Sequence, residues 1–156
     1  MREQFGRVLS ISAIGESLPN PGSLVDLDPE VKDSHGQPKA RIHSHIAETE
    51  LQRLGFMAKM SRRILEAAGV EKLVEEYGTY DAFNATHVFG TCRMGTNPRT
   101  SVVDPLCRSH RWHNLMVVDA SVFPSSGGGE APSLTIEALA IRSADKLAQR
   151  MRQKDL

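Results

Sequence analysis

One histidine in this sequence stands in a setting that suits proton transfer. His87 precedes a glycine-punctuated segment, 88–95 (VFGTCRMG), and such a loop can hold an imidazole ring exposed towards a pocket. Oxidation of an alcohol needs a group that takes the hydroxyl proton while hydride leaves the carbon, and histidine does this well near neutral pH. The competing interpretation is a structural histidine bonded to a backbone carbonyl, which is the commoner case for a lone histidine.

The other polar candidates carry weaker signals. Asp119 ends an apolar run at 115–118, where an acidic residue meets either a ligand hydroxyl or a backbone amide of a turn, and spacing alone favours neither. His110 and His113 lie three apart, and Cys107 precedes His110 by three. No acidic ligand accompanies them, so we interpret this stretch as a polar surface loop and predict no metal site.

Composition excludes several classes of protein. The chain has 156 residues, enough for one domain with a sizeable core, and 19 basic against 19 acidic residues, so nothing indicates a nucleic-acid partner. No apolar run approaches the roughly 20 residues that span a bilayer. Cys92 and Cys107 form no Cys-x-x-Cys pair and are expected to be free thiols in a reducing compartment. A cytoplasmic location is favoured, and a periplasmic one would need a signal peptide upstream of Met1.

Periodicity divides the chain near Tyr80 into residues 1–80 and 81–156. In the first part, alternation of apolar and polar residues predicts three strands joined by turns, as in an antiparallel meander. These strands are 7–14, 24–27 and 41–46. An apolar stripe at helical spacing predicts a helix over 47–68, and a second short helix is expected at 70–77.

The second part predicts a strand, a glycine-rich loop and a helix. The wholly apolar run 115–118 (LMVV) is typical of a strand buried on both faces. The glycines of 125–131 predict a loop, and an apolar stripe predicts a helix over 133–151. Pro132 stands just before that helix, where its missing N–H costs nothing. This order is typical of a cofactor-contacting edge in an α/β fold, although the glycines do not form a GxGxxG pattern.

Four sequence blocks occur in a set order. They are HVFGTCRMG (87–95), SVVDP (101–105), NLMVVDASVFPSS (114–126) and APSLTIEALAIRSADKL (131–147). Together they resemble the C-terminal portion of the glucose–methanol–choline (GMC) oxidoreductase family. The stretch 16–42 also resembles the substrate-domain strands of that family. The resemblance therefore covers nearly the whole chain.

The resemblance implies a fold of mixed α+β and α/β character. Residues 1–80 would be part of a substrate-binding domain, built on an antiparallel sheet with helices. Residues 81–156 would carry the active-site histidine and a strand–loop–helix that completes an FAD-binding α/β domain. The dinucleotide-binding motif of that domain is absent from this sequence. An N-terminal FAD-binding half is therefore expected as a partner, in the same longer protein or on a separate chain, together with a small-molecule alcohol or sugar as substrate.

The resemblance places one catalytic residue and leaves a second open. The family's active-site histidine falls on His87. Its second catalytic position, usually His or Asn, falls on Ala131, whose methyl group cannot bond a substrate oxygen. Either His87 acts alone, or the neighbouring Glu130 takes the role through a shifted loop, or the activity is weak or altered. A carboxylate at Glu130 would disfavour negative charge on reduced flavin unless it were protonated.

The resemblance also implies the residues that contact FAD. Asp119 and Ala120 match residues beside the ribityl and diphosphate part of the flavin. The segment whose backbone meets the pyrimidine edge falls on Pro132, Ser133 and Leu134, with Ala131 beside it. A helix N-terminus has free N–H groups and about half a positive charge. The start of the expected helix would therefore favour the negative charge of reduced flavin.

Together these implications predict the C-terminal part of an FAD-dependent alcohol or sugar dehydrogenase or oxidase, inactive by itself. Two alternatives come from other classes of protein. The chain could be a non-catalytic truncated or split subunit that needs an FAD-binding partner chain. It could also be a stand-alone α+β binding domain with no flavin, although four ordered blocks would then arise by chance.

Overall fold

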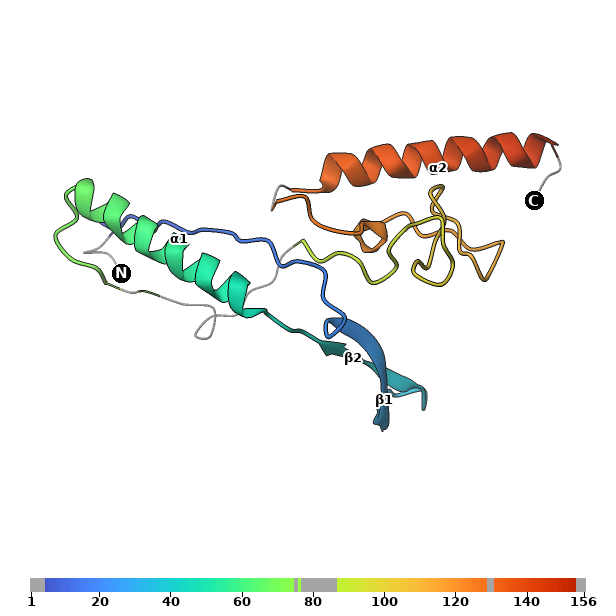
Figure 1. The fold of residues 1–156 in the computed structure, drawn as a ribbon, viewed down its shortest axis with the longest axis horizontal. Coiled ribbons are helices and arrows are strands. Elements are labelled where there is room, and N and C mark those ends of the chain that lie inside the picture. The colour runs from blue at the N-terminus through green and yellow to red at the C-terminus, as the bar shows by residue number, and fades with distance from the viewer. Residues whose placement is uncertain (1–4, 75, 77–86, 129–130, 154–156) are drawn as a thin grey trace. The chain divides into compact units, whose positions relative to one another are not determined.

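The computed structural model describes residues 5–74, 76, 87–128 and 131–153. Its elements are β1 (Leu24–Lys32), β2 (Pro38–His43), α1 (Glu48–Ala67), the 3₁₀ turn η1 (Ala120–Val122) and α2 (Ser133–Gln153) (Figure 1). They fall into two compact units, one within 1–16 and 46–84 and the other within 17–45 and 85–156. The boundary predicted near Tyr80 lies outside the described residues, so the domain assignment stays a prediction.

Strands β1 and β2 form an antiparallel hairpin with one apolar and one polar face. The register pairs Val25 with Ile42 and Asp26 with Arg41. Because side chains alternate between the faces of a strand, Val25, Leu27 and Ile42 share one face and Asp26 and Arg41 share the other. The three apolar side chains are between 48% and 78% exposed, so the apolar face is open to solvent in this chain.

The strands predicted at 24–27 and 41–46 are confirmed as β1 and β2 with shifted ends. β1 continues through Asp28 and Pro29, which we expected to end it, because the register slips there and an irregularity accommodates the missing proline N–H. The Asp28 carboxylate accepts two backbone N–H groups at this point, both at 2.9 Å. The strand predicted at 7–14 is wrong, since that segment joins no sheet. The meander therefore has two strands, not three.

Helix α1 confirms the helix predicted over 47–68. It begins with half a capping box, because the buried Glu50 carboxylate accepts the Ala47 N–H at 2.6 Å while Ala47 has no side-chain oxygen to return the bond. Gly69 follows the helix with φ +78°, in the left-handed region that glycine adopts freely. The short helix predicted at 70–77 is wrong for its described residues, which are not helical.

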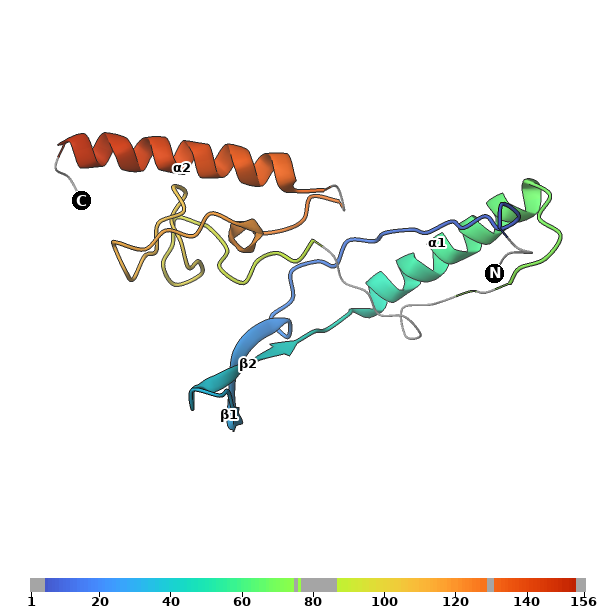
Figure 2. The ribbon, with the colours of Figure 1, turned by 180° about the vertical axis from the view of Figure 1, so that it is seen from behind.

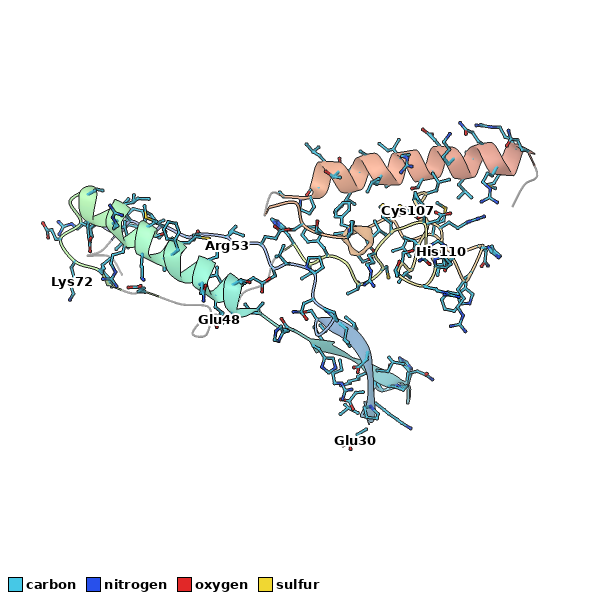
Figure 3. All side chains as sticks on the ribbon, viewed as in Figure 1. Glu30, Glu48, Arg53, Lys72, Cys107 and His110 are labelled. Atoms are coloured by element: carbon cyan, nitrogen blue, oxygen red, sulfur yellow. The ribbon has the colours of Figure 1, made fainter. Side chains whose placement is uncertain are left out.

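The extended N-terminal segment lies along α1 in both views of the ribbon (Figures 1 and 2). Arg53, labelled on α1 in Figure 3, donates to the Glu16 carbonyl at 3.1 Å. A Cβ added at Gly15 would come within 3.1 Å of the Leu54 side chain. The missing side chain at Gly15 therefore lets the segment approach the helix closely.

Helix α2 confirms the helix predicted over 133–151 and packs on a looped segment, 88–123. Both views show the helix running along this segment (Figures 1 and 2). Val103, Cys107 and Val122 are fully buried, and Leu139 of α2 packs against them. This cluster is the hydrophobic core of the described residues. A guanidinium hydrogen bond of 2.9 Å from Arg142 to the Pro105 carbonyl fastens the helix to the same segment.

The buried strand predicted at 115–118 is wrong. Met116 makes only an isolated bridge to Arg108, and Leu115 and Val118 are 43% and 40% exposed. The segment is held instead by bonds inside the loop, including one of 2.9 Å from the Val117 N–H to the Cys107 carbonyl. The expected strand–loop–helix is therefore present as a loop and a helix without its strand.

Helix α2 carries two apolar stripes, and the one predicted from the sequence is the exposed one. Leu134, Ile141 and Met151 are 81%, 64% and 57% exposed. The buried face carries Leu139, which contacts the core, and Ser143, which is fully buried. An exposed stripe of this kind marks a contact surface.

We predict that Ser143→Ala leaves the free energy of unfolding unchanged or raises it by up to about 1 kcal/mol. The buried Ser143 hydroxyl has no hydrogen-bond partner among the described residues, so its removal abolishes a desolvation cost. Ser143→Leu should overpack the same site and cost about 1–3 kcal/mol. Urea unfolding measures both, with Ser61→Ala in α1 as the control for helix propensity. A lower free energy of unfolding in Ser143→Ala would contradict the conclusion that the Ser143 hydroxyl is buried without a hydrogen-bond partner.

On the polar face of the hairpin, Arg41 binds Asp26 with two guanidinium hydrogen bonds of 2.7 and 2.9 Å. His43 Nε2 lies 3.2 Å from the same carboxylate, as an ion pair when the ring is protonated. The bonds from Arg41 are the main reason that the pKa of Asp26 falls from 3.8 to about 2, and His43 adds to the effect. The carboxylate is therefore charged in the folded chain at any pH well above 2.

We predict that the Asp26 carboxyl titrates near pH 2 in the folded chain and at a higher pH, nearer to 3.8, in Arg41→Gln, where His43 still lies beside it. ¹³C NMR of its carboxyl carbon follows the titration. Because the pKa is lowered by folding, the pair stabilises the hairpin above about pH 4, and this contribution is lost as pH falls towards 2. The same midpoint in both proteins would show that the Arg41 bonds do not lower the pKa.

Candidate active site

The looped segment brings together two stretches that are distant in sequence. We call residues 87–95 the His87 segment and residues 119–123 the Asp119 turn. The Cys92 N–H donates to the Ser121 carbonyl at 2.9 Å, and the Met94 N–H donates to the Val122 carbonyl at 2.7 Å. The rings of Phe89 and Phe123 also meet, with centroids 5.6 Å apart. The predicted catalytic histidine and the predicted FAD contact Asp119 therefore belong to adjacent pieces of backbone.

His87 has an unusual backbone and an exposed side chain. Its φ is +55°, in the left-handed region that few residues other than glycine occupy and where histidine is enriched. Such outliers gather at functional sites, because the surrounding structure must hold them. Gly90, with φ +88°, makes the next turn of the segment. The imidazole of His87 is exposed and has no hydrogen-bond partner among the described residues.

A shallow hollow lies between the His87 segment and the Asp119 turn. Its lining is Val88, Phe89, Thr91, Asp119, Ala120 and Ser121. The hollow thus contains two of the residues predicted from the resemblance, Asp119 and Ala120, beside the stretch that follows His87. Thr91 and Ser121 were not predicted, because no sequence pattern distinguishes a hydroxyl that faces a ligand from one that faces solvent.

Asp119 acts as a helix cap. Its carboxylate Oδ1 accepts the Ser121 N–H at 2.8 Å at the start of η1. The sequence left two interpretations open, a turn cap and a ligand contact. The turn cap is present. A ligand contact is compatible with it, because the other carboxylate oxygen of Asp119 has no partner among the described residues.

The hollow has the polar groups of a hydroxyl-binding site. Its six lining residues supply one carboxylate and two hydroxyls and contain no lysine, arginine or histidine. A carboxylate accepts hydrogen bonds from hydroxyl groups and repels an anion. The exposed carbon atoms of Val88, which is 73% exposed, offer an apolar wall. The side chains of this lining therefore suit a chain of carbon atoms with hydroxyl groups, and they offer no cation to a phosphate.

The other predicted site residues lie at the start of α2. Ala131 is exposed and precedes Pro132, whose carbonyl accepts the Ile136 N–H at 2.9 Å. Ser133 begins the helix, and Leu134 is 81% exposed. The described contacts do not bring these residues to the hollow. The second catalytic candidate, Glu130, lies outside the described residues.

The polar residues downstream of the His87 segment do not gather as a metal site. Among the described residues, no three His, Cys, Asp or Glu side chains could hold one ion. Cys92 and Cys107 are both free thiols, as predicted. His110 is half-buried and bonded to other parts of the loop, so the surface position that we expected for it is wrong. None of the helices described here is long and apolar enough to cross a bilayer.

We predict that Asp119→Ala lowers the free energy of unfolding by about 1 kcal/mol, the usual cost of losing an N-cap. Asp119→Asn should cost at most a few tenths, because an amide oxygen can also accept the Ser121 N–H. Urea unfolding of the two variants measures this difference. Equal losses in both would show that Asp119 contributes its charge and not a cap.

Comparison with known proteins identifies the family of the chain. Residues 19–140 match the family model for GMC oxidoreductases. The chain is 37% identical over 156 residues to 2-methyl-1,2-propanediol dehydrogenase of Mycolicibacterium austroafricanum, covering 95% of this chain and 26% of that protein. It is 37% identical over 140 residues to paromamine 6'-oxidase of Streptomyces fradiae, covering 90% and 25%.

A third relative, at 28% identity over 153 residues, is the gluconate 2-dehydrogenase flavoprotein of Pantoea cypripedii, with 94% of this chain and 25% of that protein covered. The chain thus spans about a quarter of the length of these relatives. The family model covers most of the chain, and the relatives match it almost from end to end. The chain belongs to the GMC oxidoreductase family.

Proposed function

We propose that this chain is the C-terminal part of an FAD-dependent oxidoreductase that oxidises a CH–OH group of an alcohol or sugar by hydride transfer to flavin. The observation that carries the proposal is the hydrogen-bonded pairing of the His87 segment with the Asp119 turn around one hollow. The names of the relatives support the substrate class and the cofactor, since one is a dehydrogenase of a diol and another is called a flavoprotein.

His87 is the proposed base. Its exposed imidazole would accept the hydroxyl proton of the substrate on a ring nitrogen while the carbon–hydrogen bond breaks. FAD, when bound, supplies the ring that accepts the hydride. The left-handed backbone at His87 supports the role, because the local structure holds the residue there at a conformational cost.

The hollow fits part of FAD. Asp119, Thr91 and Ser121 offer acceptors and donors for the hydroxyl groups of the ribityl chain, and Ala120 leaves room beside them. The same lining disfavours the diphosphate, because it contains a carboxylate and no cation. We therefore assign Asp119 and Ala120 to the ribityl part alone, which narrows the ribityl and diphosphate contact implied by the resemblance.

The start of α2 is the proposed contact for the pyrimidine edge of the flavin. The first N–H groups of a helix have no carbonyl one turn earlier to bond, so Ser133 and Leu134 can offer theirs to a ligand. Gly127 and Gly128, with φ +73° and +124°, adopt backbone that other residues rarely reach.

Because Ala131 stands where the family usually has His or Asn, His87 is the one imidazole that the described residues offer to the proposed site. We favour catalysis by His87 alone over a role for Glu130, because a carboxylate near reduced flavin opposes its negative charge. The absence of a second polar side chain at Ala131 removes one hydrogen bond to the substrate oxygen. Weaker orientation of the substrate is the expected consequence.

The rest of the FAD site is proposed to come from an N-terminal FAD-binding half, in the same longer protein or in a partner chain. Two observations support this: the chain covers only about a quarter of its relatives, and the stripe of Leu134, Ile141 and Met151 on α2 is exposed. The chain by itself is expected to bind no FAD. Flavin fluorescence quenching by the isolated chain, at the level seen for the complete enzyme, would contradict this.

We predict that His87→Asn lowers turnover of the complete oxidoreductase by about 10²–10⁴-fold, the usual contribution of a general base. Asparagine tolerates the left-handed region but cannot take the proton. Flavin content, measured by absorbance at the flavin band, should be unchanged. His113→Asn, an exposed histidine outside the hollow, is the matched control and should keep full turnover. Unchanged turnover in His87→Asn would rule out His87 as the base.

A further inference from the structure

His110 makes two contacts through one ring nitrogen. Its Nε2 lies 3.1 Å from the Gly95 carbonyl oxygen and 3.0 Å from the Ser101 hydroxyl oxygen. The Ser101 hydroxyl in turn lies 2.6 Å from the Asn97 carbonyl oxygen. Figure 3 places His110 on the looped segment, together with Cys107. His110 therefore contacts the 95–101 loop at Gly95 and Ser101, and Ser101 continues the chain of bonds to Asn97.

The chemistry of these partners fixes where the protons lie. A carbonyl oxygen can only accept, so His110 Nε2 carries a proton for Gly95. The Ser101 hydroxyl donates its proton to Asn97 for the same reason, and its oxygen is left as a second acceptor for Nε2. Ser101 and His110 are thus not a nucleophile and its base, because that pairing would need an unprotonated Nε2. We call the two contacts of His110 Nε2, with Gly95 and with Ser101, the clamp.

The clamp holds the end of the His87 segment. Gly95 is its last residue, and the preceding residue, Met94, makes the 2.7 Å bond to the Val122 carbonyl in the Asp119 turn. The clamp leaves no room for a side chain at Gly95, where a Cβ would come within 3.0 Å of Ser101 Cβ. The backbone N–H of His110 adds a 3.1 Å hydrogen bond to the Val102 carbonyl. Movement of the loop would therefore loosen the contact between the His87 segment and the turn.

We propose that His110 is a positioning residue of this oxidoreductase: with Nε2 protonated, it clamps the 95–101 loop and so holds the His87 segment against the Asp119 turn. Its effect on turnover rests on the proposed function, whereas its effect on the loop does not. The same Nε2 proton is present in the neutral ring and in the doubly protonated ring, so the clamp is independent of the charge on His110.

Three variants test whether the bond from His110 Nε2 to Gly95, and not merely the presence of an imidazole at position 110, holds the loop. The amide nitrogen of glutamine reaches about as far as histidine Nε2, and that of asparagine reaches only as far as Nδ1. His110→Gln should therefore keep the bond to Gly95, and His110→Asn should lose it. Ser101→Ala should have a smaller effect than His110→Asn, because it leaves the bond from Nε2 to Gly95 in place.

Amide hydrogen exchange in the 156-residue chain is the first readout. Exchange at the Met94 N–H should speed up by about five- to tenfold in His110→Asn, the effect of one lost hydrogen bond, and return to the original rate in His110→Gln. The second readout is turnover of the complete enzyme, which should fall about tenfold or more in His110→Asn and recover in His110→Gln. ¹⁵N NMR of the unaltered chain should find the proton of the neutral ring on Nε2.

Equal exchange rates in the Asn and Gln variants, or a neutral ring protonated on Nδ1, would overturn the clamp. Faster exchange in His110→Asn with unchanged turnover would overturn the positioning role. Failure of the proposed function would show separately, as full turnover in His87→Asn, and would leave the exchange result in place.

Discussion

Two backbone hydrogen bonds, from Cys92 to Ser121 and from Met94 to Val122, determine which polar residues of this chain meet. They join segments that belong to no regular sheet, so no ladder of further bonds supports them. A single bond of this kind contributes about 1 kcal/mol net. The fully buried Val103 and Val122 therefore matter beside them, because they keep water from competing for the same N–H and carbonyl groups. The hollow exists because these bonds hold its two sides at a fixed distance.

Burial in this chain is low for its length. A domain of about 150 residues normally buries some two-thirds of the surface that its unfolded chain exposes, yet only Val103, Cys107 and Val122 are fully buried hydrophobic residues in the part of the chain described. The hairpin and α2 each present an apolar face to solvent, with Ile42 and Leu134 about four-fifths exposed. Faces of this kind are stable where other polypeptide covers them, which agrees with relatives about four times as long.

The sequence predicted the elements that need only their own periodicity. Both long helices follow from apolar residues spaced at the helical repeat, whatever they pack against. A strand also needs a neighbouring strand to pair with. The alternation at 7–14 and the apolar run at 115–118 do not indicate which segment that would be, and both strand predictions were wrong. In the second case the loop folds back on itself and uses Cys107 as the acceptor. The pairing of the His87 segment with the Asp119 turn was expected from family resemblance and not from spacing. Thr91 and His110 gave no signal that sequence alone could separate from surface residues.

His87 and His110 have different environments, and each environment suits a different role for the same side chain. His110 is half-buried, and its Nε2 proton is shared between the Gly95 carbonyl and the Ser101 hydroxyl oxygen. Its ring is therefore committed to the loop. His87 is exposed beside a hollow and has no partner among the described residues, on a backbone conformation that costs energy to hold. A general base needs a free ring nitrogen at a fixed place. In the proposed function, the committed histidine fixes the loop and the free one takes the proton of the substrate hydroxyl.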